Sequence, residues 1–346
     1  MDDGLFFLCA CSDTDQGGIR LCRMDTAVSR PVELERTPLR GSTFLCFSKD
    51  GKTLYATSNS MEEGGSAAAF RCGQDGSLRF LNRVPVEGVS ACYLSCSPDG
   101  RFLYSANYAS GSVTELELAA DGSIARRVRV IEHKGACGPV PKRQDKPHAH
   151  CAVFTPDGKY LCVNDLGMDS ILLYPVTSGG LSLPAGAWMA EPGEGPRHIL
   201  FDKTGKYAYV INELSNSVTA LRYSDGTLER IGSWSTLPPD CHVETKAAAI
   251  RFSPDGRYLF ASNRGFDSIA CFRIASPGRL ELTDIVPSMG SSPRDFQFLP
   301  GGKMAAATNE FSDLVCLYDY QAETGALHYR EGEDLTGLPR PLYIVS

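Results

Sequence analysis

The sequence lacks the features that mark membrane, exported and nucleic-acid-binding proteins. Its 346 residues contain no apolar run near the roughly 18 residues that a membrane-spanning helix needs. The N-terminus opens with acidic residues and has only six apolar residues, Leu5 to Ala10, where a signal peptide has a basic region and a longer apolar segment. Lysine and arginine form no run, and the net charge is −7. We therefore expect a cytoplasmic protein that binds neither membranes nor nucleic acids.

The cysteines lack the spacing of a metal site or of a disulfide framework. There are 13 of them, an odd number, and no two form a CxxC pattern. In a reducing compartment such residues are mostly small members of the core. We expect no metal and no other cofactor.

The sequence does contain a repeated phrase, and almost no helical period. The phrase occurs as SKDGKTLYATSN, SPDGRFLYSAN, TPDGKYLCVND, DKTGKYAYVIN, SPDGRYLFASN and LPGGKMAAATN. Its glycines lie 46 to 58 residues apart, a period typical of a four-stranded propeller blade, at Gly51, Gly100, Gly158, Gly205, Gly256 and Gly302. Each copy predicts a hairpin, because an apolar strand leads into a turn whose glycine takes a positive φ and a β-rich strand follows.

The two ends of the chain supply one further blade. Residues 1–25 have the pattern of the later strands of a blade, whereas residues 338–346 match the first strands of the others, such as 195–201 and 292–298. Pairing of the two ends closes the ring and removes free sheet edges. We therefore predict an all-β, seven-bladed β-propeller over residues 1–346, a single domain whose N- and C-terminal segments share one blade.

Equivalent positions of the repeat predict two rings of side chains around the channel. The first strand of each blade borders the central axis of a propeller. Eight residues before each turn glycine, the first ring comprises Thr43, Cys92, His150, Arg197, Ala248 and Arg294, and a match to the Pro-Arg phrase adds Arg340. Eight residues after the glycine, the second ring comprises Asn59, Tyr108, Leu166, Glu213, Arg264 and Glu310. Because the strands of a hairpin are antiparallel, both rings face the same mouth.

The arginines of these rings indicate an anionic ligand. Several arginines converging on one channel end repel each other unless an anion lies among them, which favours a carboxylate or phosphate on the ligand. The alternative is structural: the arginines pair with Glu213, Glu310 and neighbouring carboxylates and tie the blades together.

Two histidines are candidates for acid–base chemistry. His148 and His150 alternate along one strand and share a face if the strand is regular. A single HxH pair is weak support for a metal site. Two roles stay open for these histidines: that of a general acid or base, and that of a structural residue. Glu213 is the other candidate base, and its alternative role is to orient Arg197.

Two recurrent asparagines and one cysteine complete the candidates. Asn212 and Asn263 are possible substrate contacts, although residues of this type at strand ends are also typical of turns. Cys92 lies in the first ring, and with no evident His/Asp partner we assign it to the channel lining rather than to nucleophilic chemistry.

Several of these phrases resemble the lactonase family of seven-bladed propellers. The resemblance covers nearly the whole chain and is strongest in PHAHCAVFTPDGKYLCVNDLGMDSI, GPRHILFDKTGKYAYVINELSNSVTAL and AAAIRFSPDGRYLFASNRGFDSIACF. The family contains propeller-type 6-phosphogluconolactonases and carboxy-muconate cyclases. It implies a site at one channel mouth built from His150 or His148, Arg197, Glu213 and Arg264. The insertion from Glu132 to Lys146 aligns with no other blade.

The resemblance implies a hydrolase that opens a small anionic sugar-acid lactone, with 6-phosphogluconolactone as the leading candidate. The arginines would bind the anion and polarise the carbonyl, and either His150 or Glu213 would activate water. The remaining expected substrate contacts are His148, Arg294, Arg340, Asn212, Asn263 and Glu310. The alternatives are a lactonising cycloisomerase of an unsaturated diacid and a non-catalytic binding scaffold. We expect a monomer or a weak homo-oligomer.

Overall fold

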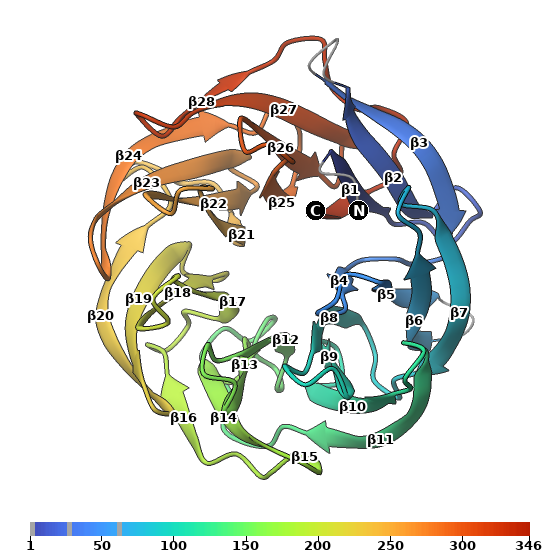
Figure 1. The fold of residues 1–346 in the computed structure, drawn as a ribbon. Coiled ribbons are helices and arrows are strands. Elements are labelled where there is room, and N and C mark those ends of the chain that lie inside the picture. Colours follow the sequence, from blue (N-terminus) through green and yellow to red (C-terminus); the bar gives the residue numbers. More distant parts are fainter. Residues whose placement is uncertain (1–3, 26–29, 61–63) are drawn as a thin grey trace.

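The chain forms seven antiparallel sheets arranged in a ring (Figure 1). The structure, a computed structural model, describes residues 4–25, 30–60 and 64–346. Within these ranges all regular elements are strands, and no helix is long and apolar enough to cross a membrane. The predicted seven-bladed β-propeller is therefore confirmed.

The strands follow each other from the central axis outward in every blade. Blade 1 contains β29 (Pro341–Val345), β1 (Leu5–Ala10), β2 (Gly18–Asp25) and β3 (Arg30–Pro38). Blade 2 contains β4 (Leu45–Phe47), β5 (Thr53–Ser60), β6 (Gly64–Cys72) and β7 (Leu78–Pro85), and blade 3 contains β8 (Ala91–Cys96), β9 (Phe102–Asn107), β10 (Ser112–Leu118) and β11 (Ile124–Glu132). Blade 4 contains β12 (Ala149–Phe154), β13 (Tyr160–Asp165), β14 (Ser170–Thr177), β15 (Gly180–Leu181) and β16 (Gly186–Met189).

The last three blades have four strands each. Blade 5 contains β17 (Pro196–Phe201), β18 (Tyr207–Asn212), β19 (Ser217–Ser224) and β20 (Thr227–Ser235). Blade 6 contains β21 (Lys246–Phe252), β22 (Tyr258–Arg264), β23 (Ser268–Ser276) and β24 (Arg279–Pro287). Blade 7 contains β25 (Pro293–Phe298), β26 (Met304–Asn309), β27 (Leu314–Gln321) and β28 (Ala326–Tyr329).

The two chain ends meet in blade 1, as predicted. Strand β29 pairs antiparallel with β1, so that Leu8 lies opposite Ile344, and Figure 1 shows the two termini close together. Of the N-terminal segment assigned to this blade, residues 1–3 lie outside the described ranges. The pairing gives the last strand a partner and closes the ring.

The repeated phrase forms the predicted hairpin turns. All six of its glycines have φ between 67° and 75°, a conformation that glycine adopts without steric cost. In blade 4, Asp157 Oδ1 accepts hydrogen bonds from the Thr155 hydroxyl at 2.6 Å and from the Lys159 N–H at 3.1 Å. The glycine fixes the turn geometry in all six copies, and in copies such as that of blade 4 an aspartate before it adds hydrogen bonds that hold the turn.

Apolar side chains fill the spaces between neighbouring blades. Among the described residues they form seven clusters, each built from two adjacent blades. Phe260 of blade 6 and Phe296 of blade 7, for example, stack with their ring centroids 5.4 Å apart. This packing holds the inner strands in place and so fixes the geometry of the channel mouth.

The inner strands carry a bulge at the first-ring position. Their pairing skips one residue at Cys92, His150, Arg197, Arg294 and Leu342. A bulge leaves the extra residue outside the ladder and redirects its side chain. In these five blades the irregularity thus presents one side chain to the central axis. The described pairing of β4 in blade 2 has no such skip, and in blade 6 the pairing skips both Ala248 and Ala249.

The register of β29 shows that Arg340 does not occupy the predicted first-ring position of blade 1. Pro341 opens β29 as Pro196 opens β17 and Pro293 opens β25, so the first-ring residue of blade 1 is Leu342. Arg340 lies two residues earlier. Its carbonyl accepts a hydrogen bond from the N–H of Cys11, which occupies the second-ring position of blade 1. The match of Pro339-Arg340 to the Pro-Arg phrase was wrong by two residues.

Candidate active site

One mouth of the channel contains a charged cavity of about 410 Å³. Nine members of the two predicted rings line it: Thr43, Asn59, Cys92, Tyr108, His150, Glu213, Arg264, Arg294 and Glu310. Arg143 and Arg340 also line it, together with Asp13 and several small residues. The prediction that both rings face one mouth is confirmed for these positions. Leu166, Ala248 and the predicted catalytic residue Arg197 are buried and outside the lining.

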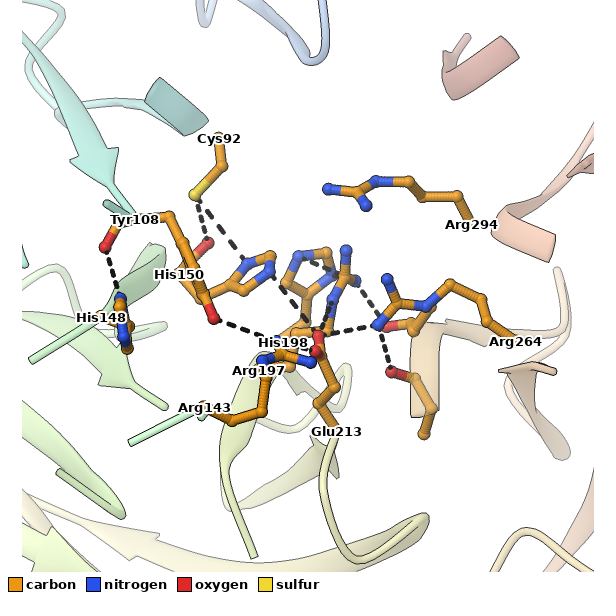
Figure 2. A network of polar contacts seen from close by, with 12 residues as sticks. Cys92, Tyr108, Arg143, His148, His150, Arg197, His198, Glu213, Arg264 and Arg294 are labelled. Carbon is orange, nitrogen blue, oxygen red and sulfur yellow. Dashed lines mark hydrogen bonds and ion pairs between the residues drawn. The ribbon is translucent and has the colours of Figure 1, made fainter. Parts of the chain in front are cut away.

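Glu213 is the centre of one cluster of charges in this cavity, which we call the Glu213 cluster. Its Oε2 lies 2.8 Å from Arg264 Nη2 and 3.1 Å from Arg197 Nε, and its Oε1 accepts a hydrogen bond from Arg143 (Figure 2). Arg197 also donates to the Ala248 carbonyl at 2.6 Å, and Arg264 to the Ala247 carbonyl at 3.2 Å. The carboxylate is therefore contacted by three arginines, two of which also donate to backbone carbonyls of blade 6.

The arginines determine the ionisation of Glu213. Burial alone would raise the pKa of this carboxyl, but Arg264, Arg143 and Arg197 outweigh it and hold the pKa far below its usual range. Burial lowers the pKa of Arg197 to about 9, and repulsion from Arg264 and Arg294 adds to this effect. Glu213 is thus a permanent anion and a poor proton acceptor at neutral pH.

His150 lies beside this cluster and is neutral. Its Nε2 is 3.9 Å from Glu213 Oε2, and its Nδ1 is 3.9 Å from Cys92 Sγ. Burial, followed by the charge of Arg197, lowers its pKa well below the usual value, although Glu213 opposes the shift. A neutral imidazole that lines the cavity next to a fixed carboxylate can accept a proton, and the carboxylate then stabilises the cation.

Cys92 has no features of an activated nucleophile. Burial raises the pKa of its thiol to about 12, and its sulfur lies 3.4 Å from the His150 carbonyl oxygen. The geometry agrees with its assignment to the lining.

Sequence reasoning missed Arg143. It lies in the 132–146 insertion, which has no counterpart in the repeat, and its guanidinium reaches both Glu213 and the Tyr108 hydroxyl, the latter at 3.0 Å. The neighbouring Gln144 is buried and donates to the Leu166 carbonyl at 2.9 Å. The insertion is therefore anchored to blade 4 where it delivers Arg143 to the mouth.

A second buried contact anchors the start of the insertion. His133 Nδ1 lies 2.6 Å from Asp165 Oδ2, and neither side chain is exposed. The other oxygen of Asp165 accepts the His148 N–H at 2.8 Å. Asp165 replaces the asparagine that stands at this repeat position in blades 3, 5, 6 and 7, and together with the 58-residue spacing between Gly100 and Gly158 it is the sequence signal of a special loop here.

His148 points away from the cavity. It precedes β12, and the bulge at His150 breaks the alternation that would have placed both histidines on one face. Its ring stacks on Tyr108 with centroids 4.4 Å apart, and its nitrogens contact the Tyr108 carbonyl at 2.9 Å and Asp145 at 3.0 Å (Figure 2). Its position indicates support of Tyr108 and of the insertion rather than substrate contact.

Asn212 and Asn263 also lie outside the lining and are fully buried. The amide of Asn212 donates to Ser217 and Thr219 at 3.0 and 2.8 Å. That of Asn263 donates to the Thr236 carbonyl at 2.9 Å. Their amides are used in contacts within the protein, to the following strand for Asn212 and to the segment after β20 for Asn263, so the structural alternative describes them and their contact with substrate stays a prediction.

A second cluster of charges, the Glu310 cluster, lies in the same cavity. Glu310 Oε1 is 2.5 Å from Arg340 Nη2, and its Oε2 is 3.4 Å from Arg294 Nη1. Arg294 points toward the centre of the mouth, across from Cys92 and His150 (Figure 2). The cavity therefore has two glutamates, each held by more than one arginine.

No group of three or more histidine, cysteine or acidic residues with the geometry of a metal site occurs in the described part of the chain.

The ring of seven sheets and its charged mouth define the class: a β-propeller with a polar small-molecule site at one end of its channel. The family described as "Lactonase, 7-bladed beta-propeller" matches residues 6–344. A Bacillus subtilis protein named 6-phosphogluconolactonase is 37% identical over 316 residues, which cover 90% of this chain and 89% of that protein. The chain belongs to this lactonase family.

Solved structures agree with this assignment. The periplasmic gluconolactonase PpgL of Pseudomonas aeruginosa superposes with a TM-score of 0.92 and 28% identity, covering 99% of this chain and 98% of that one. A Lactobacillus plantarum protein superposes with a TM-score of 0.90 and 30% identity, with the same coverage.

Proposed function

We propose that the protein hydrolyses a sugar-acid lactone, with 6-phosphogluconolactone as the first candidate substrate. The observation that carries this proposal is the imidazole of His150, 3.9 Å from the arginine-bound carboxylate of Glu213, in a cavity whose other charged groups are mostly arginines. The names of the Bacillus and Pseudomonas relatives support the reaction class. The cavity volume of about 410 Å³ lies within the usual range for small-molecule sites.

His150 is the base that activates water. It lines the cavity and is neutral, whereas the oxygens of Glu213 are occupied by arginines and its pKa is held low. In the first step a water oxygen attacks the lactone carbonyl carbon while His150 takes a proton from that water. The imidazolium so formed is stabilised by Glu213, whose Oε2 is 3.9 Å away.

Arg264 stabilises the oxyanion of the tetrahedral intermediate. It lines the cavity, and its Nη2 is fixed by Glu213 and the Ala247 carbonyl, so the guanidinium is oriented before the substrate binds. Arg197 lies beneath the cavity and fixes Glu213. In the second step the carbonyl re-forms, the ring C–O bond breaks, and His150 returns its proton to the departing oxygen.

Lactone turnover by the purified protein tests this proposal. We expect hydrolysis of 6-phosphogluconolactone above its spontaneous rate, and a loss of about 100-fold or more in kcat for His150→Asn. His328→Asn, in an exposed histidine of β28, is the matched control. Circular dichroism and thermal unfolding separate loss of activity from loss of fold. Equal activity of both variants would refute the role of His150.

The other expectations remain predictions. A lactonising reaction would use the same arginines, and carboxy-muconate in the substrate panel tests it. If the protein is a non-catalytic binding scaffold, it should turn over no lactone. The expected cytoplasmic location is likewise untested, and one structural relative is named as periplasmic.

A further inference from the structure

We propose that Arg294 and Arg340, joined through Glu310, form a separate subsite for a phosphate group of the substrate. This inference rests on the proposed lactone hydrolysis and adds to it the part of the cavity that recognises the remote end of the substrate. The Glu213 cluster then acts on the lactone ring, and the Glu310 cluster distinguishes phosphorylated from unphosphorylated lactones.

The first argument is the balance of charge. Glu310 is one carboxylate facing two guanidinium groups, and its contact with Arg294 is long at 3.4 Å. The tie between blades 6 and 7 is made elsewhere by one arginine and one carboxylate, Arg251 and Asp295, at 2.7 Å. A purely structural pair needs no second arginine. The other carboxylate that acts on Arg340, that of Asp13, is exposed and screened by solvent, so positive charge of the Glu310 cluster is available to an anion.

The second argument is access. The side chains of Arg294 and Arg340 are 28% and 54% exposed, whereas Arg197 in the Glu213 cluster is 3% exposed. Both arginines line the cavity. A ligand entering the mouth can therefore reach their guanidinium groups without displacing the buried part of the site.

The third argument is the backbone of Arg340. Its φ of 43° is an uncommon conformation for a residue with a side chain. The Arg340 N–H donates to Asp313 Oδ1 at 2.8 Å, and its carbonyl accepts from the Cys11 N–H at 3.1 Å. At the equivalent position blade 5 has Gly195, where a Cβ would lie 2.6 Å from Leu214. The equivalent residues of blades 3 and 7, Ser90 and Ser292, have the same conformation with φ of 61° and 63°. The conformation therefore belongs to the repeat, and blade 1 uses it to place an arginine at the mouth.

The arrangement gives the substrate a direction. The two clusters lie in one cavity, with His150 and Arg264 belonging to one and Arg340 to the other. A planar guanidinium donates two parallel hydrogen bonds to phosphate oxygens, and a phosphate has enough oxygens to engage both arginines. With its phosphate at the Glu310 cluster, a phosphorylated sugar lactone has its ring carbonyl toward His150 and Arg264. Asp13, which lines the mouth nearby, opposes anion binding weakly because it is exposed.

The test compares two substrates that differ only in the phosphate. We would measure kcat and KM for 6-phosphogluconolactone and for gluconolactone with Arg340→Gln and Arg294→Gln. Loss of a charge-assisted hydrogen bond corresponds to about tenfold or more. We therefore expect Arg340→Gln to raise KM for the phosphorylated lactone at least about tenfold more than for gluconolactone, with the larger change in KM rather than in kcat. Arg222→Gln, in an exposed arginine of β19, is the matched control.

A binding measurement keeps this test independent of turnover. Calorimetric titration with 6-phosphogluconate and with gluconate should show tighter binding of the phosphorylated acid, and Arg340→Gln should reduce that preference. Equal loss for both ligands, or no loss in a folded variant, would overturn the subsite. Absence of turnover of both lactones by the wild-type protein, with the phosphate preference intact, would instead refute the hydrolysis and leave the subsite standing.

Discussion

The two glutamates of the channel mouth have similar partners but different surroundings. Glu213 is enclosed by three arginines, two of which also bind backbone carbonyls of the next blade. Glu310 contacts two arginines that are more exposed, and its contact with Arg294 is long, at 3.4 Å. The difference suggests two uses of the same ion pair. Enclosed arginines preorganise a carboxylate for chemistry, whereas accessible ones can exchange a carboxylate for a ligand anion.

Removal of the charge of Glu213 should have the largest effect. Glu213→Gln leaves Arg143, Arg197 and Arg264 without their shared anion, and breaking a buried ion pair in this way costs about 3–5 kcal/mol of unfolding free energy. We expect kcat to fall by about 100-fold or more, because the imidazolium of His150 loses its counterion. Denaturant unfolding and lactone kinetics measure the two effects. The same free energy of unfolding is measured for Glu310→Gln. An equal loss of stability in that variant would show that the two clusters do not differ in this way.

Loss of Arg143 should have the next largest effect. Arg143→Ala removes one of the three arginines on Glu213 and the partner of the Tyr108 hydroxyl, so we expect kcat to fall about tenfold or more. Lys142→Ala, in the exposed neighbour on the same loop, controls for disturbance of the insertion. Equal activity of the two variants would show that the insertion contributes no functional side chain.

The pH dependence should reveal the neutral state of His150. Because its pKa in the folded protein is lowered, the base stays available as the pH falls through 6.5, and the acidic limb of kcat/KM should lie below that value. The unfolded chain binds a proton there that folded His150 does not, so this group also lowers folding stability as the pH drops below about 6.5. An acidic limb of kcat/KM at or above pH 6.5 would contradict this prediction. If His150→Asn keeps that limb, a group other than His150 causes it.

The smallest effect is expected at the rim of the Glu310 cluster. Asp13→Asn removes an exposed negative charge near Arg340, so KM for a phosphorylated lactone should fall by about twofold, as expected for one screened surface charge. The change should shrink at high salt. An increase in KM would indicate that Asp13 contacts the substrate directly.

The repeat made most of this mouth predictable. The two ring positions lie eight residues before and eight residues after each turn glycine, so Glu213, Arg264 and His150 could be placed at one mouth from the sequence. The same logic also favoured a structural role for the asparagines. What the repeat predicts is the position of a residue within a blade, and it succeeds where the blades are equivalent.

The repeat fails where a blade departs from the others. Arg143 lies in an insertion without a counterpart, so no equivalence could place it. Arg340 precedes Pro341 and follows Pro339, and either proline can be aligned with Pro196, so the register was ambiguous by two residues. His148 turned away because the bulge at His150 breaks strand alternation. The insertion itself and the asparagine-to-aspartate change at Asp165 marked the loop as unusual, but neither shows where Arg143 lies.

A crystal structure of the protein with bound 6-phosphogluconate would test the division of the mouth most directly. The account predicts that the carboxylate of the ligand lies beside His150 and Arg264, with the phosphate between Arg294 and Arg340. A phosphate in contact with Arg264, or a ligand bound outside the mouth, would contradict it.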